Sequence, residues 1–353
     1  MKKWFYVLMA AIVAMVMMSC SDDNNNSEGD DNGGSISDNC TIELQIKGNR
    51  ISATDFRIGT LHPEEFIINW GDGTEETYTT EAFTHQKGDI TWHGDYWLQE
   101  YYAKELGHIY EDNAEEHIIT ITGKRILELF IHEVRCMEVD ITRCETLECL
   151  KVAVTTIASL DVSHNPKLVY LDVHDNMTLE TLDVRHNPEL LFLDCALAKI
   201  STLDLSNNTK LQQFNGAGMR ELPSLDVSHC PDLKSLDLTN SGLSSLNINN
   251  CRILHSLYCE NNRLTTLDAS DCVSLAHLDC QGNQLTSLNI NGCSNLSALY
   301  CGGNKFTEDA MTEVYKALPE ATDNTTPILV FDKYEYGEIW IATKKGWKLI
   351  IEE

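Results

Sequence analysis

Leucines, with one phenylalanine among them, recur along the middle of this chain of 353 residues at spacings of 10 or 11. Such a fixed period is typical of stacked repeats, because one repeat alone cannot bury its apolar residues. Stacked turns bury them in one continuous core, and each turn then contacts only its neighbours. The sequence therefore predicts a solenoid whose turn is 21 or 22 residues long. The recurring positions are Leu150, Leu160, Leu171, Leu182, Leu193, Leu203, Phe214, Leu225, Leu236, Leu246, Leu257, Leu267, Leu278, Leu288 and Leu299.

The cleanest copies read LHSLYCENNRLTTLDASDC, LAHLDCQGNQLTSLNINGC and LSALYCGGNKF. They resemble the leucine-rich repeat, L-x-x-L-x-L-x-x-N-x-L, and in particular the cysteine-bearing repeats of the internalin J type. The resemblance spans residues 137–306 and implies an α/β-type leucine-rich-repeat solenoid, mostly β with short return segments, over residues 125–306. The matching residues are Leu254, Leu257, Cys259, Asn262 and Leu264, then Leu275, Leu278, Cys280, Asn283 and Leu285.

The two halves of each turn look alike, so the position of the inner strand has to be chosen. We place it in the half that contains Asn-x-Leu, around Leu257 and Cys259, and assign the other half, around Leu267, to the return segment. Asparagines that follow the inner strand are expected to point inward, because buried backbone groups need hydrogen-bond partners. These asparagines are Asn262, Asn283 and Asn304.

Most of the 13 cysteines fall into two columns with the period of the repeat. One column follows the inner strand, and the other lies at the turn of the return half, where asparagine replaces cysteine in some copies. The strand column contains Cys195, Cys259, Cys280 and Cys301. The turn column contains Cys144, Cys230, Cys251, Cys272 and Cys293, with Asn165, Asn187 and Asn208 in the turns between.

We interpret both cysteine columns as buried free thiols that act as small apolar residues. Residues in register on neighbouring strands stand about 4.8 Å apart, farther than the ~3.8 Å between the Cβ atoms of a disulfide. A metal is the remaining alternative, but a line of thiols does not make a tetrahedron. No metal or other cofactor is therefore expected. Cys136, Cys144 and Cys149, at the less regular edge, are the candidates for a disulfide.

The first 39 residues indicate export. Two lysines, an apolar run from Trp4 to Met18 and Ser19-Cys20 resemble a lipoprotein signal peptide over residues 1–19, with Cys20 as the lipidated residue. The acidic, polar stretch over residues 20–39 cannot bury enough surface to fold and is predicted to be a disordered tether. An outer-membrane lipoprotein at the surface of a Gram-negative bacterium is therefore expected. An unmodified Cys20 and a plain linker are the alternatives, and the side of the membrane is left open.

Residues 40–124 contain short alternating strands with turn signals, which is typical of an all-β sandwich. The segments Trp70–Thr74, His108-x-Tyr110 and Ile119-x-Ile121-x-Gly123 resemble the PKD-like, immunoglobulin-type domain. Residues 84–106 form an aromatic-rich insertion, either a contact surface or a hairpin packed on its own domain. Asp72 is interpreted as a turn residue rather than a calcium ligand. His85, His93, His108 and His117 are interpreted as ordinary histidines rather than zinc ligands.

The period stops after Phe306, and residues 307–353 are predicted to form a small α/β cap that covers the last turn. Thr307 is a plausible helix N-cap, and Pro319 ends that helix. Strands are expected over Ile328–Phe331 and near the C-terminus, with a short helix over Ile339–Lys345 between them.

No nucleophile elbow, phosphate-binding glycine loop or zinc-protease motif occurs in the sequence, so we do not expect an enzyme. A net charge of −28 disfavours nucleic acid as a partner. A solenoid offers an extended concave face, and the expected function is binding or adhesion to a protein or glycan by a monomer. An accessory lipoprotein that captures polysaccharide or peptide for an enzyme or transport system, and a structural envelope spacer, are the alternatives.

The candidate ligand face consists of the residues that flank the inner-strand leucines. Its mixture of aromatic and acidic side chains suits a carbohydrate or a basic protein loop, although aspartate can also be a soluble filler at this repeat position. The candidates are Tyr170, Asp172, Phe192, Asp194, Asn215, Asp237, Tyr258, His277, Asp279 and Tyr300.

Overall fold

The computed structural model describes residues 38–48, 50–82, 102–111, 116–321, 327–332 and 337–352. The expected signal peptide, Cys20, nearly all of the tether, and the aromatic insertion up to residue 101 lie outside these residues, as do His85 and His93. Within the described ranges, no helix is both long enough and apolar enough to cross a membrane.

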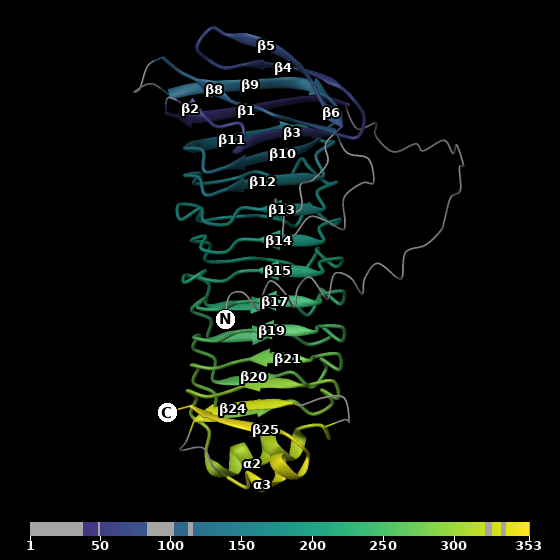
Figure 1. Cartoon of the computed structure of the whole chain (residues 1–353), viewed down its shortest axis with the longest axis vertical. Helices are drawn as coiled ribbons and strands as arrows, with labels where there is room; N and C mark the ends of the chain where they lie inside the picture. The colour runs from purple at the N-terminus through teal and green to yellow at the C-terminus, as the bar shows by residue number, and fades with distance from the viewer. Residues whose placement is uncertain are drawn as a thin grey trace, which may run out of the picture.

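A stack of short parallel strands dominates the molecule, like the rungs of a ladder (Figure 1). Equivalent leucines pair in register from rung to rung, for example Leu171 with Leu193 and Leu257 with Leu278. The prediction of a solenoid is confirmed by these registers. The parallel run, which is part of a 14-stranded sheet, contains β10 (Ile126–His132), β12 (Cys149–Ala153), β13 (Tyr170–Asp172), β14 (Phe192–Asp194), β15 (Gln213–Asn215), β17 (Ser235–Asp237), β19 (Ser256–Tyr258), β21 (His277–Asp279), β23 (Ala298–Tyr300), β24 (Ile328–Asp332) and β25 (Lys348–Glu352).

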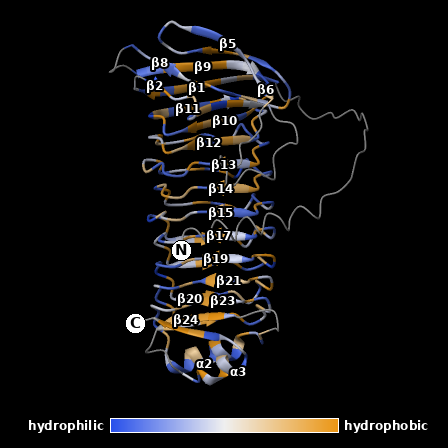
Figure 2. Cartoon of the chain, in the orientation of Figure 1, coloured by the Kyte–Doolittle hydropathy of each residue, from blue (hydrophilic) through white to orange (hydrophobic). Residues whose placement is uncertain are grey.

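The opposite side of the stack is formed by the return halves of the turns. Here the parallel pairs are β16 (Ser224–Asp226) with β18 (Ser245–Asn247), and β20 (Thr266–Asp268) with β22 (Ser287–Asn289). The half with Asn-x-Leu therefore lies in the long sheet, and the other half lies opposite. Leucines from both sides, such as Leu257 and Leu267, are buried between them. Figure 2 shows apolar and polar residues interspersed throughout the turns of the stack.

The N-terminal part forms two layers of strands above the stack (Figure 1). One layer is a five-stranded sheet in the order β11-β1-β9-β4-β5, and the other extends the long sheet through β3, β7 and β6. Phe56, Trp70 and Ile119 are buried within this part. The strands are β1 (Asn39–Lys47), β2 (Arg50–Ile51), β3 (Phe56–Thr60), β4 (Glu65–Asn69), β5 (Glu75–Thr79), β6 (Glu81–Ala82), β7 (Tyr102–Glu105), β8 (His108–Ile109), β9 (Glu116–Lys124) and β11 (Cys136–Arg143).

The strands on either side of residue 124 interleave between the two layers. After β9, the chain enters the long sheet as β10, which pairs antiparallel with β3 and parallel with β12. It then returns to the five-stranded sheet as β11, which pairs with β1. The two layers are therefore continuous with the first turns of the solenoid.

The C-terminal residues lie at the far end of the stack (Figure 1). Helix α2 (Glu308–Ala317) begins after Thr307, whose side chain accepts a hydrogen bond from the backbone N–H of Ala310. Such an N-cap satisfies one of the unpaired donors of the first turn. Helix α3 (Trp340–Lys344) precedes β25. The indole of Trp347 donates to the carbonyl of Pro319, which joins the last strand to the end of α2.

Candidate ligand-binding face

The solenoid has two outward faces, and the return side forms strands only from Ser224 onward. We call the outward residues of the long sheet the main face and those of the opposite side the return face. In each three-residue rung the central residue, leucine except for Phe214, points inward, and the residues before and after it lie on the other side of the strand, where Tyr170 and Asp172 are nonetheless buried. The residue pairs on the return face are Ser159/Asp161, Thr181/Asp183, Thr202/Asp204, Ser224/Asp226, Ser245/Asn247, Thr266/Asp268 and Ser287/Asn289.

The return face is uniform, and its acidic residues have a structural role. Every rung has serine or threonine before the leucine and aspartate or asparagine after it. The Oδ1 atom of Asp161 accepts from the N–H of Ser163 at 2.9 Å, and Asp268 accepts from Ser270 at 3.0 Å. These side chains close the turn that follows the rung, as Asx-turns do.

The acids of the main face close turns in the same way. Asp194 accepts from the N–H of Ala196 at 2.9 Å, Asp237 from Thr239 at 2.9 Å, and Asp279 from Gln281 at 3.2 Å. Asp172 and Asn215 make the equivalent bonds to His174 and Ala217. The acidic column is therefore part of the repeat, and the residues that break it distinguish the main face.

Tyr258 and Tyr300 occupy positions in this column where a turn-closing acid would otherwise stand. Asp279 lies between them, since its rung is in register with both. The ring of His277 lies 4.9 Å from that of Tyr258 and 5.2 Å from that of Tyr300, centroid to centroid. All four residues are half-buried. Burial lowers the pKa of His277 to about 4, so its imidazole is neutral at pH 7. We call these four residues the C-terminal cluster.

Glu260 follows the C-terminal cluster on the chain and has an unusual environment. Its Oε2 atom is buried and has no hydrogen-bond partner among the described residues. Burial raises the pKa of Glu260, and the nearby charge of Asp237 raises it further. A buried carboxylate oxygen without a partner is costly, and a cationic group or a hydroxyl from a ligand would satisfy it.

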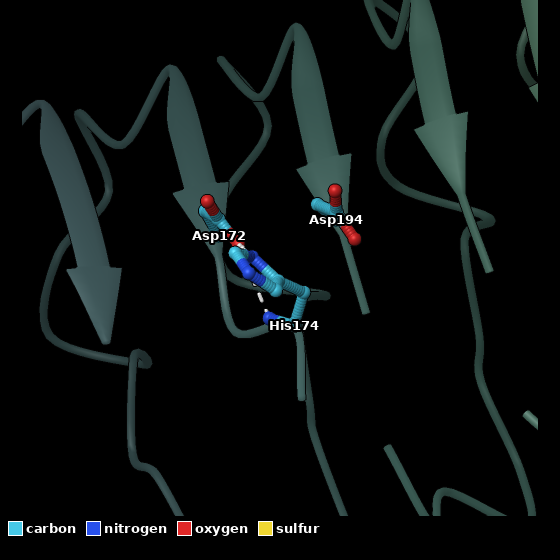
Figure 3. A group of neighbouring side chains, drawn as sticks. All are labelled: Asp172, His174 and Asp194. Carbon is cyan, nitrogen blue, oxygen red and sulfur yellow. Dashed lines mark hydrogen bonds and ion pairs between the residues drawn. The ribbon is translucent and has the colours of Figure 1, made fainter. Parts of the chain in front are cut away.

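A second set, the N-terminal cluster, is formed by Tyr170, Phe192, Asp172, His174 and Asp194. The rings of Tyr170 and Phe192 stack with centroids 4.5 Å apart. The Nδ1 atom of His174 lies 2.6 Å from Oδ1 of Asp172, and Asp194 lies on the next rung (Figure 3). Beyond the cluster, Lys151 on β12 forms an ion pair of 3.0 Å with Asp172.

The two carboxylates of the N-terminal cluster have opposite pKa shifts. Burial alone would raise the pKa of Asp172, but the hydrogen bond from His174 and the charge of Lys151 hold it below its ordinary value. Burial and the charge of Asp172 raise the pKa of Asp194 to about 7, although Asn215 donates to it at 2.9 Å. Asp194 therefore titrates near neutral pH.

Asp172, His174 and Asp194 each offer one ligand atom, and these atoms lie within 4.8 Å of one another. A divalent cation needs such ligands, but Asp172 is already paired with Lys151 and His174. A cation bound there would lie beside the ammonium group of Lys151 and would have to break the contact between Asp172 and His174. The arrangement is better suited to hydrogen bonding than to metal binding, and the absence of a metal stays a prediction.

The asparagines that follow the inner strands use both ends of the side chain. The Nδ2 group of Asn283 donates to the carbonyls of Cys259 and Cys280 at 2.8 and 3.1 Å, and its Oδ1 atom accepts from the N–H of Leu264 at 3.0 Å. Each amide therefore joins two successive turns. Asn262 and Asn304 make equivalent bonds.

The asparagines of the return turn use only the donor end. Asn187 donates to the carbonyls of Val162 and Asn165, both at 2.9 Å, but its Oδ1 atom has no partner among the described residues. Asn165 and Asn208 share this pattern. A thiol at the same position donates to the equivalent carbonyl, as Cys251 does to Val227 at 3.4 Å. Cysteine therefore replaces asparagine where only a donor is needed.

All cysteines within the described residues are buried free thiols. They include the strand column of Cys195, Cys259, Cys280 and Cys301 and the turn column of Cys230, Cys251, Cys272 and Cys293. Burial raises the pKa of Cys251 to about 12 and that of Cys293 to about 12, so these thiols are unreactive at neutral pH.

In the N-terminal part, Asp72 closes a turn by accepting from the N–H of Thr74 at 2.9 Å, and its other oxygen lies 2.8 Å from Nε2 of His108. The bond to the Thr74 hydroxyl and the contact with His108 lower the pKa of Asp72. The imidazole of His108 stacks on Trp70 with centroids 4.5 Å apart. Asp72 and His108 therefore contact each other, and the interpretation of the histidines as ordinary ones stays a prediction, because His85 and His93 lie outside the described residues.

No family model matches the chain, and no curated protein matches it. Among solved structures, a similar chain is the functional domain of InlJ from Listeria monocytogenes, described as including a cysteine ladder. The identity is 24%, over 63% of this chain and 52% of that chain, with a TM-score of 0.46. This chain thus spans about half the length of that neighbour.

Two further neighbours are the leucine-rich repeat domain of APL1B and the internalin InlF from Listeria monocytogenes. The first has 17% identity over 60% of this chain and 68% of that chain, with a TM-score of 0.39. The second has 19% identity over 65% of this chain and 88% of that chain, with a TM-score of 0.28. The assignment of a solenoid is therefore based on the strand registers of the chain itself and not on these neighbours.

The structure brings most of the candidate face residues together in two clusters. The acidic residues of the face close turns, whereas its aromatic rings contact one another. Asn215 and Asp237 lie between the clusters and close turns. Sequence reasoning missed His174, which belongs to the N-terminal cluster, and Lys151 and Glu260, which lie beside the two clusters. His174 and Glu260 follow an outward column residue by two positions, as Thr239 and Gln281 do, and that column could have been read from the repeat.

Proposed function

We propose that the chain is a non-enzymatic cell-surface binding or adhesion lipoprotein whose main face contacts a protein or glycan ligand. The contrast between the two faces supports this. Both faces have the same column of turn-closing side chains, yet only the main face carries aromatic side chains on its rungs. The repeat of serine or threonine, leucine, and aspartate or asparagine would be enough to build the solenoid. The aromatic residues that replace this pattern on the main face alone therefore support a role in ligand contact.

The chemistry of the C-terminal cluster suits either ligand class. Aromatic rings such as Tyr258 and Tyr300 provide large contact area at low entropic cost, and they stack on sugar rings or bind cations. The carboxylates of Asp279 and Glu260 accept hydrogen bonds from hydroxyl, ammonium or guanidinium groups. Glycans and basic protein segments therefore remain the two candidate classes, and the salt dependence of binding separates them.

The test is a binding screen of the chain from residue 40 to 353 against glycan and extracellular-matrix arrays. The double variant Tyr258→Ala/Tyr300→Ala should reduce binding by about tenfold or more, because buried tyrosines carry much of the energy of an interface. The matched control, Thr266→Ala/Ser287→Ala on the return face, should bind as the parent does. Retained affinity in the tyrosine variant would move the site elsewhere.

Attachment to the outer membrane through lipid on Cys20 is part of the same proposal. The Cys20→Ser variant should move from the membrane fraction to the soluble fraction of cells, and protease treatment of intact cells should degrade the parent if the chain faces outward. A soluble parent would contradict the anchor. We also propose a PKD-like N-terminal domain and a capping role for residues 307–353, which would shield the open ends of the stack.

Two other roles remain as alternatives. An accessory lipoprotein that captures polysaccharide or peptide for a transport system would bind a nutrient rather than a host or matrix ligand. A structural spacer would bind nothing on either array while being fully folded. The screen therefore distinguishes the three roles.

A further inference from the structure

Cys40 and Cys144 come together at the junction of the N-terminal layers and the solenoid. Cys40 lies near the start of β1, and Cys144 directly follows β11. These strands are antiparallel neighbours, and Thr41 pairs with Arg143. Cys40 directly precedes Thr41 and Cys144 directly follows Arg143, so the two cysteines flank the last pair of this register, although 103 residues separate them along the chain.

The two thiols share the same surroundings. The Sγ atom of Cys40 lies 3.0 Å from Oγ1 of Thr146 and 3.9 Å from the carbonyl oxygen of Ile126. The Sγ atom of Cys144 lies 4.0 Å and 3.7 Å from the same two atoms. The two thiols also hydrogen-bond each other. Both side chains are buried, with exposed fractions of 1% and 0%.

This arrangement differs from that of the repeat cysteines. In the rest of the turn column, each thiol donates to a carbonyl that no second thiol contacts: Cys251 to that of Val227 and Cys272 to that of Ile248. Those sulfurs point at backbone oxygens of preceding turns. At the junction, by contrast, both sulfurs converge on one acceptor and on each other. The junction pair is therefore the one that the geometry singles out for covalent linkage.

We propose that Cys40 and Cys144 are joined by a disulfide bond when the chain folds under oxidising conditions. The thiolate of one cysteine attacks a small-molecule or protein disulfide, which releases one thiol and leaves a mixed disulfide. The second cysteine then attacks that mixed disulfide, the S–S bond between Cys40 and Cys144 forms, and a second thiol leaves. The protein loses two protons and two electrons, and the external disulfide is reduced.

The electrostatics of the pair favour Cys40 as the first nucleophile. The hydrogen bond from Cys144 lowers the pKa of Cys40 to about 7, whereas the same bond and burial raise the pKa of Cys144. At neutral pH a substantial fraction of Cys40 is therefore thiolate, the reactive form. The other cysteines with resolved shifts have raised pKa values.

The linkage has a mechanical consequence. The bond would close a loop that contains β1 to β11, and so tie the first strand of the fold to the first turns of the solenoid. Crosslinks that close long loops restrict the unfolded chain strongly. β1 is also the strand at which residues 1–38 enter the fold, so force applied from that end would reach the crosslink first.

The experiment uses the full chain refolded in a mixture of oxidised and reduced glutathione, then denatured, alkylated and digested without reductant. A peptide pair linked through Cys40 and Cys144 is expected, two hydrogen atoms lighter than the sum of its parts. Quantitative alkylation of both residues, or linkage of either one to a different cysteine, would overturn the proposal. The variant Cys136→Ser is the matched control and should retain the link.

Thermal unfolding of the parent with and without reductant gives a second readout. Adding reductant to the oxidised parent should lower its melting temperature by several degrees. The Cys40→Ser variant should show no such shift. An unchanged melting temperature of the parent on reduction, with the link shown to be cleaved, would contradict the stabilising role of the bond.

Discussion

The hydrogen bonds required at two buried turn positions explain why one accepts either asparagine or cysteine and the other contains asparagine. At the return turn, the buried position needs one donor toward a carbonyl, which Asn187 and Cys251 both supply. Asparagine leaves its own oxygen unpaired there, so a thiol costs less. After the inner strand, Asn283 must also accept from Leu264, and a thiol does this only weakly. This difference explains why cysteine replaces asparagine in the turn column but not at the positions of Asn262, Asn283 and Asn304.

Matched substitutions test this explanation. Asn283→Cys should lower the free energy of unfolding by about 1–3 kcal/mol, because it leaves the N–H of Leu264 without its acceptor. Asn187→Cys should change it by less than about 1 kcal/mol, because a donor remains. Denaturant unfolding of both variants is the measurement. Equal losses would show that the acceptor end of the amide does not matter.

We expect the carboxylate of Glu260 to lower the stability of the free protein and to contribute to ligand binding. Its carboxylate is partly buried with one oxygen unpartnered, so Glu260→Gln should raise the melting temperature at neutral pH by removing a poorly solvated charge. If the ligand is basic, the same variant should bind it more weakly. Asp268→Asn on the return face serves as the control for loss of one charge. A less stable Glu260→Gln protein would contradict the assignment.

Asp194 should give the N-terminal cluster a pH dependence. Its pKa in the folded chain is raised to about 7, so its contribution to stability is fully present below the ordinary value near 4 and is lost as the pH rises through about 7. Melting temperatures of the parent and Asp194→Asn, compared between about pH 5 and about pH 8, test this. The variant should show a smaller decrease with pH. Parallel profiles would rule out Asp194 as the titrating group.

At the scale of elements, the repeat could be predicted from the sequence and the junction could not. The Asn-x-Leu signal placed the inner strand, because an amide that both donates and accepts is used where the inner strand turns into the return segment. Periodicity carries no information on antiparallel pairing between distant segments. The pairing of β3 with β10 and of β1 with β11 depends on such contacts, so the interleaving around residue 124 was not foreseen.

The helix at the end of the stack offers a test at this scale. Thr307→Ala removes the acceptor for the N–H of Ala310 and should cost about 1 kcal/mol. Hydrogen exchange should increase first in α2 and leave the central rungs protected. Thr307→Ser, which keeps the hydroxyl, is the control. Uniformly faster exchange along the whole stack would show instead that α2 and the rungs unfold as one unit.

At the scale of the whole molecule, the length of the turn determines which residues become neighbours on the same face. Tyr258 and Asp279 are neighbours because one turn separates them, whereas Tyr258 and Asp268 lie on opposite faces despite being closer in sequence. The candidate site could be predicted as a set of columns. Which of its aspartates close turns could not be predicted, because the repeat pattern does not distinguish a turn-closing aspartate from a ligand-binding one.

The most direct test of the main face is a proximity measurement on two double variants labelled with a pyrene maleimide. The described native cysteines are buried, and the unaltered chain serves as the labelling blank. Tyr258→Cys/Asp279→Cys should show excimer emission, because these positions pair in register on adjacent rungs. Tyr258→Cys/Asp268→Cys should show only monomer emission. Excimer emission from the second pair and none from the first would contradict the placement of the main face.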